Sequence, residues 1–395
     1  MRKILRILAC ATGASTALVL AGTATAGAAL TAPSARAAAA APAPVRFYVT
    51  NTNGQSISPF PVLTTVTPVR GRTTLPAINV GQNPSALAIT PNGKTLYVAN
   101  TGAQTVGRTV SPIPTATNKP GKAIKVGKYP DAIVITPNGK TAYVANAGSG
   151  TVTPIHIATN KPGKAIKVGT SPELLAVTPN GRTVYVVNEA SNTVTPIRTA
   201  TNKAGKAINV GQVPDAIAIT PNGKTVYVVS RTSSTVTPIR TATNKAGPPI
   251  SVPAGPSAIV VTPNSATAYV ASSESVGVVT PIATATNTAS PPISTGNYPG
   301  SLAITPDGKT VYAIFSGILT SIPGTVVPIR TATNTAGAPI TVGDGAGHMV
   351  ITPNGRAGYV VDFYSNSVTR INIATNKVTA TIGAGPFPYA IALVP

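Results

Sequence analysis

The chain has 395 residues, of which 30 are Lys or Arg and only 8 are Asp or Glu, so its formal net charge is +22. A single cysteine excludes a disulfide framework and leaves no thiolate set for an iron–sulfur cluster or a cysteine-based zinc site. A balance this basic favours polyanions as neighbours, and no apolar run beyond the N-terminal region is long enough for a membrane-spanning helix.

The N-terminal residues have the order typical of a secretory signal. A Met-Arg-Lys start precedes an apolar run over residues 4–20, and an Ala-x-Ala motif follows it. We therefore expect a signal peptide over residues 1–26, with a second Ala-x-Ala motif as an alternative cut at residue 37. Residues 27–44 are rich in Ala and Pro and are expected to be disordered. The sequence thus predicts a secreted, extracellular protein whose one folded domain spans residues 45–395.

A repeat is legible through the rest of the chain. Thr-Pro-Asn-Gly-Lys-Thr and its variants recur at separations of 46, 42, 42, 42, 43 and 47 residues. A period of this length is typical of a β-propeller, in which each repeat forms one blade of four short strands. The repeats start at Thr90, Thr136, Thr178, Thr220, Thr262, Thr305 and Thr352.

One repeat shows how the four strands are expected to follow each other. Strands are predicted over residues 215–220 and 225–230, because an Asn-Gly turn between two such runs is a strong hairpin signal. A third strand is predicted over residues 235–240 and a fourth over residues 249–252. Pro238 lies within the third strand, where it lacks an N–H for the ladder, so we expect it near an edge or a bulge.

The two ends of the chain complement each other. Residues 47–51 read as a second strand without a first, and residues 388–394 read as a first strand without a second. Pairing the two would complete a blade and close the ring, which removes exposed sheet edges. The sequence therefore predicts an all-β propeller of about eight four-stranded blades. Seven blades remain an alternative if one irregular repeat is not a blade.

A recurring motif gives these strands a family resemblance. Tyr48-Val-Thr-Asn51 is echoed by Tyr-Val-x-Asn at residues 97–100, 143–146 and 185–188. In these residues the chain resembles the YVTN-repeat, or YncE-like, propeller family over almost all of its predicted folded part. The resemblance implies the propeller fold and an exported or surface-associated protein, some relatives of which bind nucleic acid. Propellers also include lactonases and polysaccharide lyases, so the fold does not select an activity.

Basic residues gather in the turns that follow the first and third strands of each blade. The usual propeller winding brings both sets of turns to one face, which we call the turn face. This pattern predicts a disc that attracts polyanions, or a solvated face that was copied with each repeat. The turn-face residues are Lys94, Lys140, Arg182, Lys224, Lys309 and Arg356, together with Lys119, Lys122, Lys161, Lys164, Lys203, Lys206, Lys245 and Lys377.

Acidic residues are predicted on the opposite face, which we call the loop face, with the exception of Asp307, which lies in a turn. The predicted loop-face acids are Asp131, Glu173, Glu189, Asp215, Glu274, Asp344 and Asp362. Asp131, Glu173 and Asp215 hold one repeat position in three consecutive blades, at the start of the innermost strand. We therefore expect them to converge at the mouth of the central channel. Carboxyl groups held close together raise each other's pKa or bind a cation such as Ca²⁺, which suggests a catalytic acid/base set. The alternative is that neighbouring repeats share residues only because they were copied together.

Further candidates lie in the same loops. His348 stands where other repeats have alanine, near the start of an innermost strand, and we predict that it carries a proton at the mouth as a fourth catalytic residue. Aromatic side chains outside the repeat resemble a platform for stacking sugar rings. The predicted substrate-binding residues are Lys128, Tyr129, Tyr298, Phe387 and Tyr389.

Two functional classes follow from these features. The preferred one is an extracellular enzyme, a lyase or hydrolase, that degrades an anionic polysaccharide of the hyaluronan or pectate kind at the channel mouth. The other is a non-catalytic cell-wall or matrix module that binds a polyanion through the turn face. Nucleic acid is a weaker partner because aromatic side chains are missing from that face. The protein is expected to be a monomer. It has no H-E-x-x-H, P-loop, G-x-G-x-x-G or G-x-S-x-G motif, which argues against zinc, nucleotide and ordinary serine hydrolase chemistry.

Overall fold

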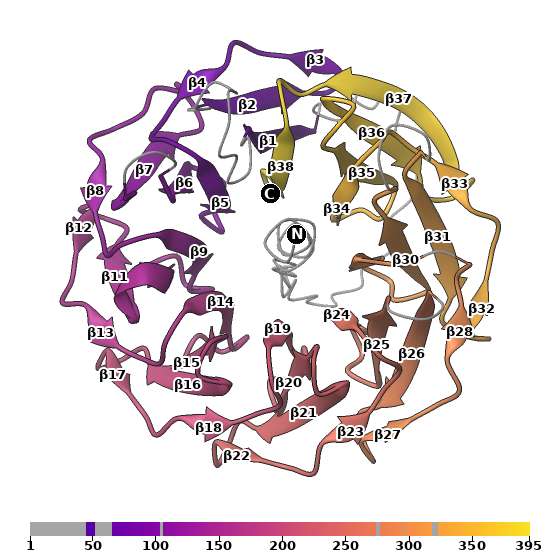
Figure 1. The fold of residues 1–395 in the computed structure, drawn as a ribbon. Coiled ribbons are helices and arrows are strands. Elements are labelled where there is room, and N and C mark those ends of the chain that lie inside the picture. Colours follow the sequence, from indigo (N-terminus) through magenta and orange to yellow (C-terminus); the bar gives the residue numbers. More distant parts are fainter. Residues whose placement is uncertain (1–44, 52–64, 103–105, 274–276, 297, 318–322) are drawn as a thin grey trace, which may run out of the picture.

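Eight antiparallel sheets stand around a central channel like the blades of a propeller (Figure 1). The computed structural model describes residues 45–51, 65–102, 106–273, 277–296, 298–317 and 323–395. Across this part of the chain the one helical segment is the short 3₁₀ helix η1 (Ala147–Ser149). The structure therefore confirms the predicted all-β propeller, and it selects eight blades over seven.

Each blade has three regular strands, counted outward from the channel. The innermost strands are β5 (Pro84–Ile89), β9 (Pro130–Ile135), β14 (Pro172–Val177), β19 (Pro214–Ile219), β24 (Pro256–Val261), β29 (Ser301–Ile304), β34 (Ala346–Ile351) and β38 (Pro388–Leu393). The second strands are β1 (Arg46–Asn51), β6 (Thr95–Asn100), β10 (Thr141–Asn146), β15 (Thr183–Asn188), β20 (Thr225–Ser230), β25 (Thr267–Ser272), β30 (Thr310–Phe315) and β35 (Ala357–Asp362). The third strands are β2 (Thr65–Arg70), β7 (Thr109–Pro114), β11 (Thr151–His156), β16 (Thr193–Arg198), β21 (Thr235–Arg240), β26 (Val278–Ala283), β31 (Thr325–Arg330) and β36 (Ser367–Asn372).

The outermost strand is broken into two-residue pieces in most blades. These pieces are β3 (Thr73–Thr74) and β4 (Ile78–Asn79), β8 (Ile124–Lys125), β12 (Lys161–Pro162) and β13 (Ile166–Lys167), β17 (Lys203–Ala204) and β18 (Ile208–Asn209), β22 (Lys245–Ala246) and β23 (Ile250–Ser251), β27 (Thr288–Ala289) and β28 (Ile293–Ser294), and β32 (Thr335–Ala336) and β33 (Ile340–Thr341). Only the blade of β36 has a continuous outer strand, β37 (Lys377–Gly383), among the residues described.

Proline explains this break. The carbonyl of Pro238 accepts a bond from the N–H of Gly247, so the backbone of Pro238 faces the outer strand. Its missing N–H therefore costs nothing in the pairing with β20, and the outer strand is interrupted opposite it. In β36 an arginine, Arg370, stands in place of the proline, and there the outer strand runs unbroken beside it. The expectation that Pro238 lies near an edge is confirmed.

The ends of the chain close the ring. β1 pairs with β38 in antiparallel register, with Phe47 opposite Leu393 and Val49 opposite Ile391. The eighth blade is thus built from both ends of the folded part of the chain, as predicted (Figure 1).

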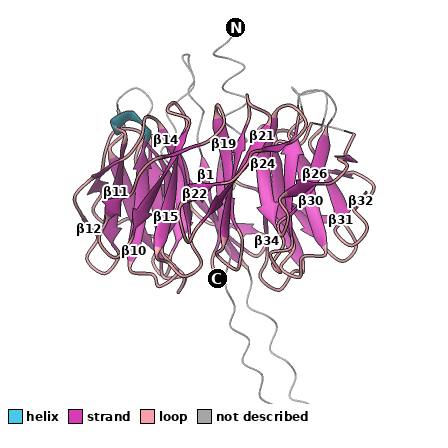
Figure 2. Ribbon diagram, turned by 90° about the horizontal axis from the view of Figure 1, so that it is seen from below, coloured by secondary structure: helices cyan, strands magenta, loops and turns pink. Residues whose placement is uncertain are grey.

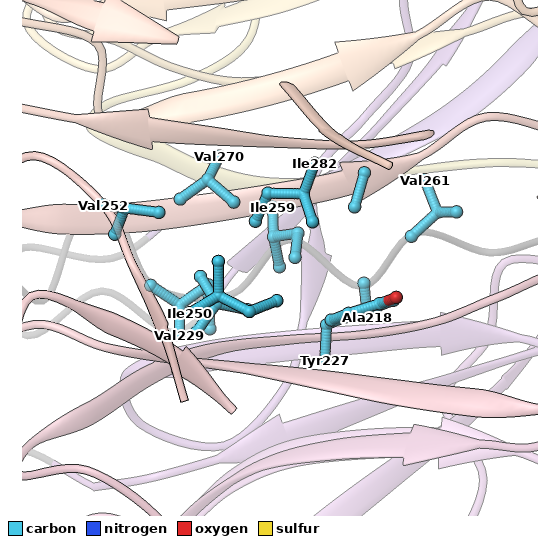
Figure 3. Packing of buried hydrophobic residues seen from close by; sticks show 12 residues of the cluster. Ala218, Tyr227, Val229, Ile250, Val252, Ile259, Val261, Val270 and Ile282 are labelled. Carbon is cyan, nitrogen blue, oxygen red and sulfur yellow. The ribbon is translucent and has the colours of Figure 1, made fainter. Parts of the chain in front are cut away.

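The hydrophobic core lies between blades rather than within one. In one such layer Val229 and Ile250 of one blade pack against Ile259, Val270 and Ile282 of the next (Figure 3). Similar clusters of Val, Ile, Leu and Ala recur around the ring. Burial of both faces of each sheet explains why the strands read as nearly continuous runs of β-branched residues.

In seven blades a tyrosine of the second strand is hydrogen bonded to the following blade. Its hydroxyl donates to the Oδ1 atom of an asparagine in the turn after the third strand of the following blade, over 2.5–2.7 Å. Each of these asparagines has a positive φ, a conformation that asparagine tolerates well. The pairs are Tyr48–Asn118, Tyr97–Asn160, Tyr143–Asn202, Tyr185–Asn244, Tyr227–Asn287, Tyr269–Asn334 and Tyr312–Asn376.

The two faces of the disc differ as the sequence indicated. η1 follows a second strand and therefore marks the loop face, at the top of Figure 2. All fourteen lysines and arginines named above are exposed, but Lys161, Lys203, Lys245 and Lys377 lie in outermost strands and not in turns. The predicted signal peptide lies outside the described residues, among which no helix is long and apolar enough to cross a membrane.

Candidate functional site at the channel mouth

The central channel is the cavity that the innermost strands enclose. It holds about 850 Å³ of open space, counting its solvent-filled mouth. Most of its wall is apolar and comes from β5, β9, β14, β19, β24, β34 and β38. Its polar lining residues are Ser85, Asp131, His348 and Tyr389. A mostly apolar cavity with a few polar groups at one end is typical of a site for a small molecule.

In most innermost strands a β-bulge lies near this mouth. In β19 the pairing with β20 shifts between Pro214 and Ala216, and the extra residue is Asp215. Glu173 occupies the corresponding bulge of β14, and Asp131 that of β9. A bulged residue has no cross-strand partner, so its side chain can be directed away from the sheet. The local structure therefore directs the three predicted acids to one place.

The residue before the bulge proline has a left-handed backbone in several blades. Positive φ values occur at Tyr129, Ser171, Val213 and Phe387, where the turn must reverse before the innermost strand begins. A β-branched residue such as Val213 adopts this conformation only at a cost. The backbone is therefore locally strained at the mouth, and strain of this kind often occurs at functional sites.

Each bulge residue faces the residue that follows the second strand of its own blade, sixteen positions later. Ser85 hydrogen bonds to Thr101, whose hydroxyl also donates to the carbonyl of Pro130 over 2.8 Å. Asp215 accepts from Arg231 over 3.4 Å, which is the one ion pair that the described mouth residues form.

The same pairing brings Glu189 opposite Glu173. Sequence reasoning placed Glu189 on the loop face but did not include it in the site. The signal that could have found it is the strand register, since Pro172 pairs with Asn188 in β15. In the blade of Asp131 the corresponding position is Ala147, so Asp131 has no ionic partner there. We call Asp131, Glu173, Glu189 and Asp215 the carboxyl cluster.

Burial and mutual repulsion change the ionisation of this cluster. Burial raises the pKa of Glu173 to about 8, and the charge of Glu189 adds to the increase. Burial also raises the pKa of Asp131 to about 6, again with a contribution from Glu189. For Asp215, burial raises the pKa to about 6 although the charge of Arg231 opposes the increase. At neutral pH, Glu173 therefore keeps its proton while Asp131 is mostly ionised.

His348 lies on the opposite arc of the channel. It is 8% exposed, and its ring packs edge-on to Tyr389 with 6.0 Å between ring centroids. Its Nε2 atom is buried and has no hydrogen-bond partner. Burial lowers the pKa of His348 to about 4, so the ring is neutral at physiological pH. A neutral ring can donate or accept a hydrogen bond, but it is a weak base.

The predicted substrate-binding residues are placed less uniformly. Tyr389 lines the channel, whereas Tyr129 and Tyr298 are 41% and 47% exposed on the loop face. Lys128 is also exposed there, and its backbone N–H donates to Ser149. Phe387 packs against Phe363, with 5.3 Å between ring centroids. The structure thus brings Tyr389 to the channel with Asp131 and His348, while the other four lie on the surrounding surface.

The carboxyl cluster does not have the geometry of a metal site. Among the described residues, no group of three or more Asp, Glu, His or Cys side chains is arranged to hold a metal ion. The acids come from three neighbouring blades and therefore lie along one arc of the mouth instead of meeting at a point. Calcium binding stays a prediction from the sequence.

The fold and the site define an eight-bladed β-propeller with an acidic channel mouth. A family model described as "Lactonase, 7-bladed beta-propeller" matches residues 45–174 and 100–209, less than half of the chain. The chain has one blade more than that description. No match was found among curated protein sequences.

Solved structures with the same fold are numerous. The dihydro-heme d1 dehydrogenase NirN is 14% identical with a TM-score of 0.70, covering 91% of this chain and 77% of that one. A putative 6-phosphogluconolactonase from Bacteroides uniformis is 15% identical with a TM-score of 0.57, covering 89% and 99%. Kuenenia stuttgartiensis hydrazine synthase is 23% identical with a TM-score of 0.59, covering 74% and 96%. At these identities the likeness establishes the fold alone.

These comparisons overturn the functional prediction from the sequence. The matching family is a lactonase family, and the similar structures are propellers of the 6-phosphogluconolactonase and NirN kind, not enzymes that degrade polysaccharides. Degradation of an anionic polysaccharide is therefore wrong, and nothing in the comparisons supports the alternative of a polysaccharide-binding wall module. The error arose because exposed tyrosines beside carboxyl groups were interpreted as a sugar platform, although Tyr129 and Tyr298 lie outside the channel lining.

Proposed function

We propose that the protein hydrolyses a small lactone, a cyclic ester, at the carboxyl cluster of the channel mouth. The observation that carries the proposal is the pairing of a protonated carboxyl group, Glu173, with an ionised neighbour, Asp131, that has no partner in its own blade. A site that holds an acid and a base side by side at neutral pH suits ester hydrolysis. The family model that matches residues 45–209 supports the choice of a lactone.

The reaction assigns one role to each group. The Asp131 carboxylate takes a proton from water as the water oxygen bonds to the lactone carbonyl carbon. Glu173 gives its proton to the ring oxygen as the bond between that oxygen and the carbonyl carbon breaks. The cluster has then lost one proton from Glu173 and gained one on Asp131, and transfer between them restores the starting state. Burial, together with the charge of Glu189, keeps the proton on Glu173, and Arg231 holds Asp215 in place.

The charge of the mouth suits this direction of reaction. A lactone has no carboxylate, but its product, a hydroxy acid, does. Product formation therefore places a new negative charge beside Asp131 and Asp215, and repulsion favours release. The same repulsion disfavours phosphorylated lactones, so the proposed substrate differs in charge from the substrate named for the 6-phosphogluconolactonase-like structures.

The proposal is tested by following acid release from a panel of γ- and δ-lactones without anionic groups, at constant pH. We expect hydrolysis above the spontaneous rate, and we expect Glu173→Gln and Asp131→Asn each to lower kcat by about 100-fold or more, the usual contribution of a general acid or base. No acceleration with any lactone of the panel, or full activity in both variants, would refute the proposal.

The chain supplies matched controls. Asp307 lies on the turn face, where it accepts from Thr305 and from the N–H of Lys309, as Asn222 does in its own repeat from Thr220 and Lys224. Asp307→Asn should therefore leave hydrolysis unchanged. Ser85 and Ser257 hold the bulge position in two other blades, so Asp131→Ser and Glu173→Ser should fold and yet lack activity.

Two finer assignments accompany this proposal. We infer membership of the YVTN-repeat propeller family from the Tyr-Val-x-Asn motif of β1, β6, β10 and β15. We also infer secretion from the signal-like residues 1–26. Mass spectrometry of the mature N-terminus after expression with the full leader tests the second, and an uncleaved N-terminus would contradict it.

A further inference from the structure

We infer that the channel mouth binds a small organic cation, with an ammonium group among the carboxyl cluster and a hydrogen-bonding group toward His348. The lactone of the proposed reaction would then carry an ammonium group, and this part of the inference rests on the proposed function. The binding site itself does not.

The charge balance of the mouth is the first support. Four carboxyl groups gather there in a protein with a formal net charge of +22, yet the one ion pair among the described mouth residues is that of Arg231 with Asp215. The distance between Arg231 Nη1 and Asp215 Oδ2 is 3.4 Å, which is long for an ion pair. His348 is neutral and cannot balance the cluster. A cation is therefore the ligand that removes the repulsion among these groups.

The second observation that supports a cation site is that the fold does not require acidic residues at the bulge position. The same bulge position holds Ser85, Ser257, Gly300 and Gly347 in other blades. In the serine blades the side chain is satisfied by the neighbouring blade, for instance Ser257 by the carbonyl of Pro299 over 3.4 Å. Burying acids there costs stability, because burial raises their pKa values.

His348 is an independent pointer to a ligand. It replaces the alanine found at 132 and 216, lines the same channel as Asp131, and has a buried Nε2 atom without a partner. A buried polar atom left unpaired costs free energy unless a ligand satisfies it. The acids and His348 lie on opposite arcs of a channel whose other lining residues include the apolar Leu175 and Ile259. A molecule that spans them needs a polar group at each end and an apolar middle.

The distribution of the acids favours an organic cation over a metal ion. The carboxyl groups come from three neighbouring blades, and the described side chains offer no cluster that could hold a metal. An ammonium group reaches separate acceptors through several N–H donors, so it fits acids that are spread along one arc of the mouth.

Calorimetry with ring compounds that cannot be hydrolysed tests this inference apart from catalysis. The probes are piperidinium, uncharged tetrahydropyran of similar shape, and cyclohexanecarboxylate. We expect piperidinium to bind at least about tenfold more tightly than tetrahydropyran, a difference typical of one charged contact, and cyclohexanecarboxylate not to bind. Equal affinities for piperidinium and tetrahydropyran would overturn the inference.

Proton release gives the same experiment a second readout. Burial raises the pKa of Asp131 and that of Asp215 to about 6, so at pH 6 each carboxyl group is about half protonated. Asp131 interacts with Glu189 and Glu173, and Asp215 with Arg231 and Glu189. A cation beside Asp131 and Asp215 lowers their pKa values, so binding at pH 6 should release a fraction of a proton, seen by titration in buffers of different ionisation enthalpy. Asp131→Ser should reduce this release and weaken binding, whereas Asp307→Asn should change neither. Tight binding at pH 6 without proton release would overturn the placement of the cation at Asp131 and Asp215.

His348→Ala tests the second contact. Alanine is the residue at this position in β9 and β19, so the variant should fold. We expect 4-hydroxypiperidinium to bind the protein more tightly than piperidinium does, and this difference to disappear in His348→Ala. An unchanged difference would overturn the role of His348.

The two proposals can fail separately. Binding of piperidinium without hydrolysis of any lactone would refute the proposed function and leave the cation site standing. Hydrolysis of neutral lactones with no preference for an amino-substituted lactone over its hydroxyl analogue would refute the cation site and leave the proposed function standing.

Discussion

Asp362 is a buried acid outside the carboxyl cluster, and its replacement by asparagine is predicted to stabilise the protein. It is fully buried at the end of β35, at the position that asparagine holds in β1, β6, β10 and β15. Its Oδ2 atom accepts from Ser367 and Thr369, over 2.9 and 2.6 Å, but its Oδ1 atom has no partner. In the blade of β10, Asn146 instead donates to Thr153 and accepts from Gly127.

The size of the effect follows from the pKa of Asp362. Burial raises it from 3.8 to about 6, against the opposing hydrogen bonds. The folded state therefore holds the proton more tightly than the unfolded state does, so stability is greatest below pH 4 and falls as the pH rises through about 6. A difference of about two units corresponds to roughly 3 kcal/mol at 1.36 kcal/mol per unit. We expect Asp362→Asn to gain about 2–3 kcal/mol at pH 7.5 and to lose this advantage near pH 4.

Denaturant unfolding at several pH values measures the effect. The free energies of unfolding of the wild type and of Asp362→Asn should converge near pH 4, move apart as the pH rises from about 4 to about 6, and differ by a constant amount above that. The reciprocal variant Asn146→Asp should lose stability at pH 7.5 and recover it on acidification. If Asp362→Asn is no more stable than the wild type at any pH between 4 and 8, the burial argument is incorrect for this residue and loses force for the carboxyl cluster.

Two further predictions concern the scaffold. Tyr227→Phe should lower the free energy of unfolding by about 1–2 kcal/mol, because it leaves Asn287 without its donor. Tyr359→Phe should have almost no effect in the same denaturation assay, because the following blade turns at Gly71 instead of an asparagine, and equal losses in both variants would contradict this account. Val213→Gly should stabilise the protein by about 0.5–1 kcal/mol, since the left-handed backbone costs valine more than glycine loses in entropy. Gly255 and Gly345 already hold this position in other blades with positive φ, so a lower melting temperature of the variant would count against strain at Val213.

Much of the scaffold could be predicted because the repeat is regular. The strand halves at residues 47–51 and 388–394 indicated the closed ring of eight blades, and the turn residues indicated the basic face. The sequence missed the break in the outer strand, because β-branched residues at 249–252 suggest one run whereas the pairing follows the proline of the third strand.

The site could be predicted only in part. The shared repeat position places Asp131, Glu173 and Asp215 at the bulges of three neighbouring innermost strands, and of the three Asp131 is the one that lines the channel. Glu189 was missed because its place depends on the register across a bulge, which residue spacing does not reveal. Asp362 was counted with the loop acids, but it is the last residue of a buried strand. The protonation states of Glu173 and His348 could not be predicted because they depend on burial in the folded protein. The activity could not be predicted because it depends on which side chains line the channel.

The pH dependence of lactone hydrolysis is the most direct test of the central claim that the carboxyl cluster supplies both an acid and a base. The base, Asp131, must be ionised and the acid, Glu173, must be protonated. The account therefore predicts that kcat/KM rises as the pH passes about 6 and falls as it passes about 8, with the alkaline limb missing from the residual activity of Glu173→Gln. A profile without an alkaline limb in the wild type, or one that Glu173→Gln leaves unaltered, would contradict it.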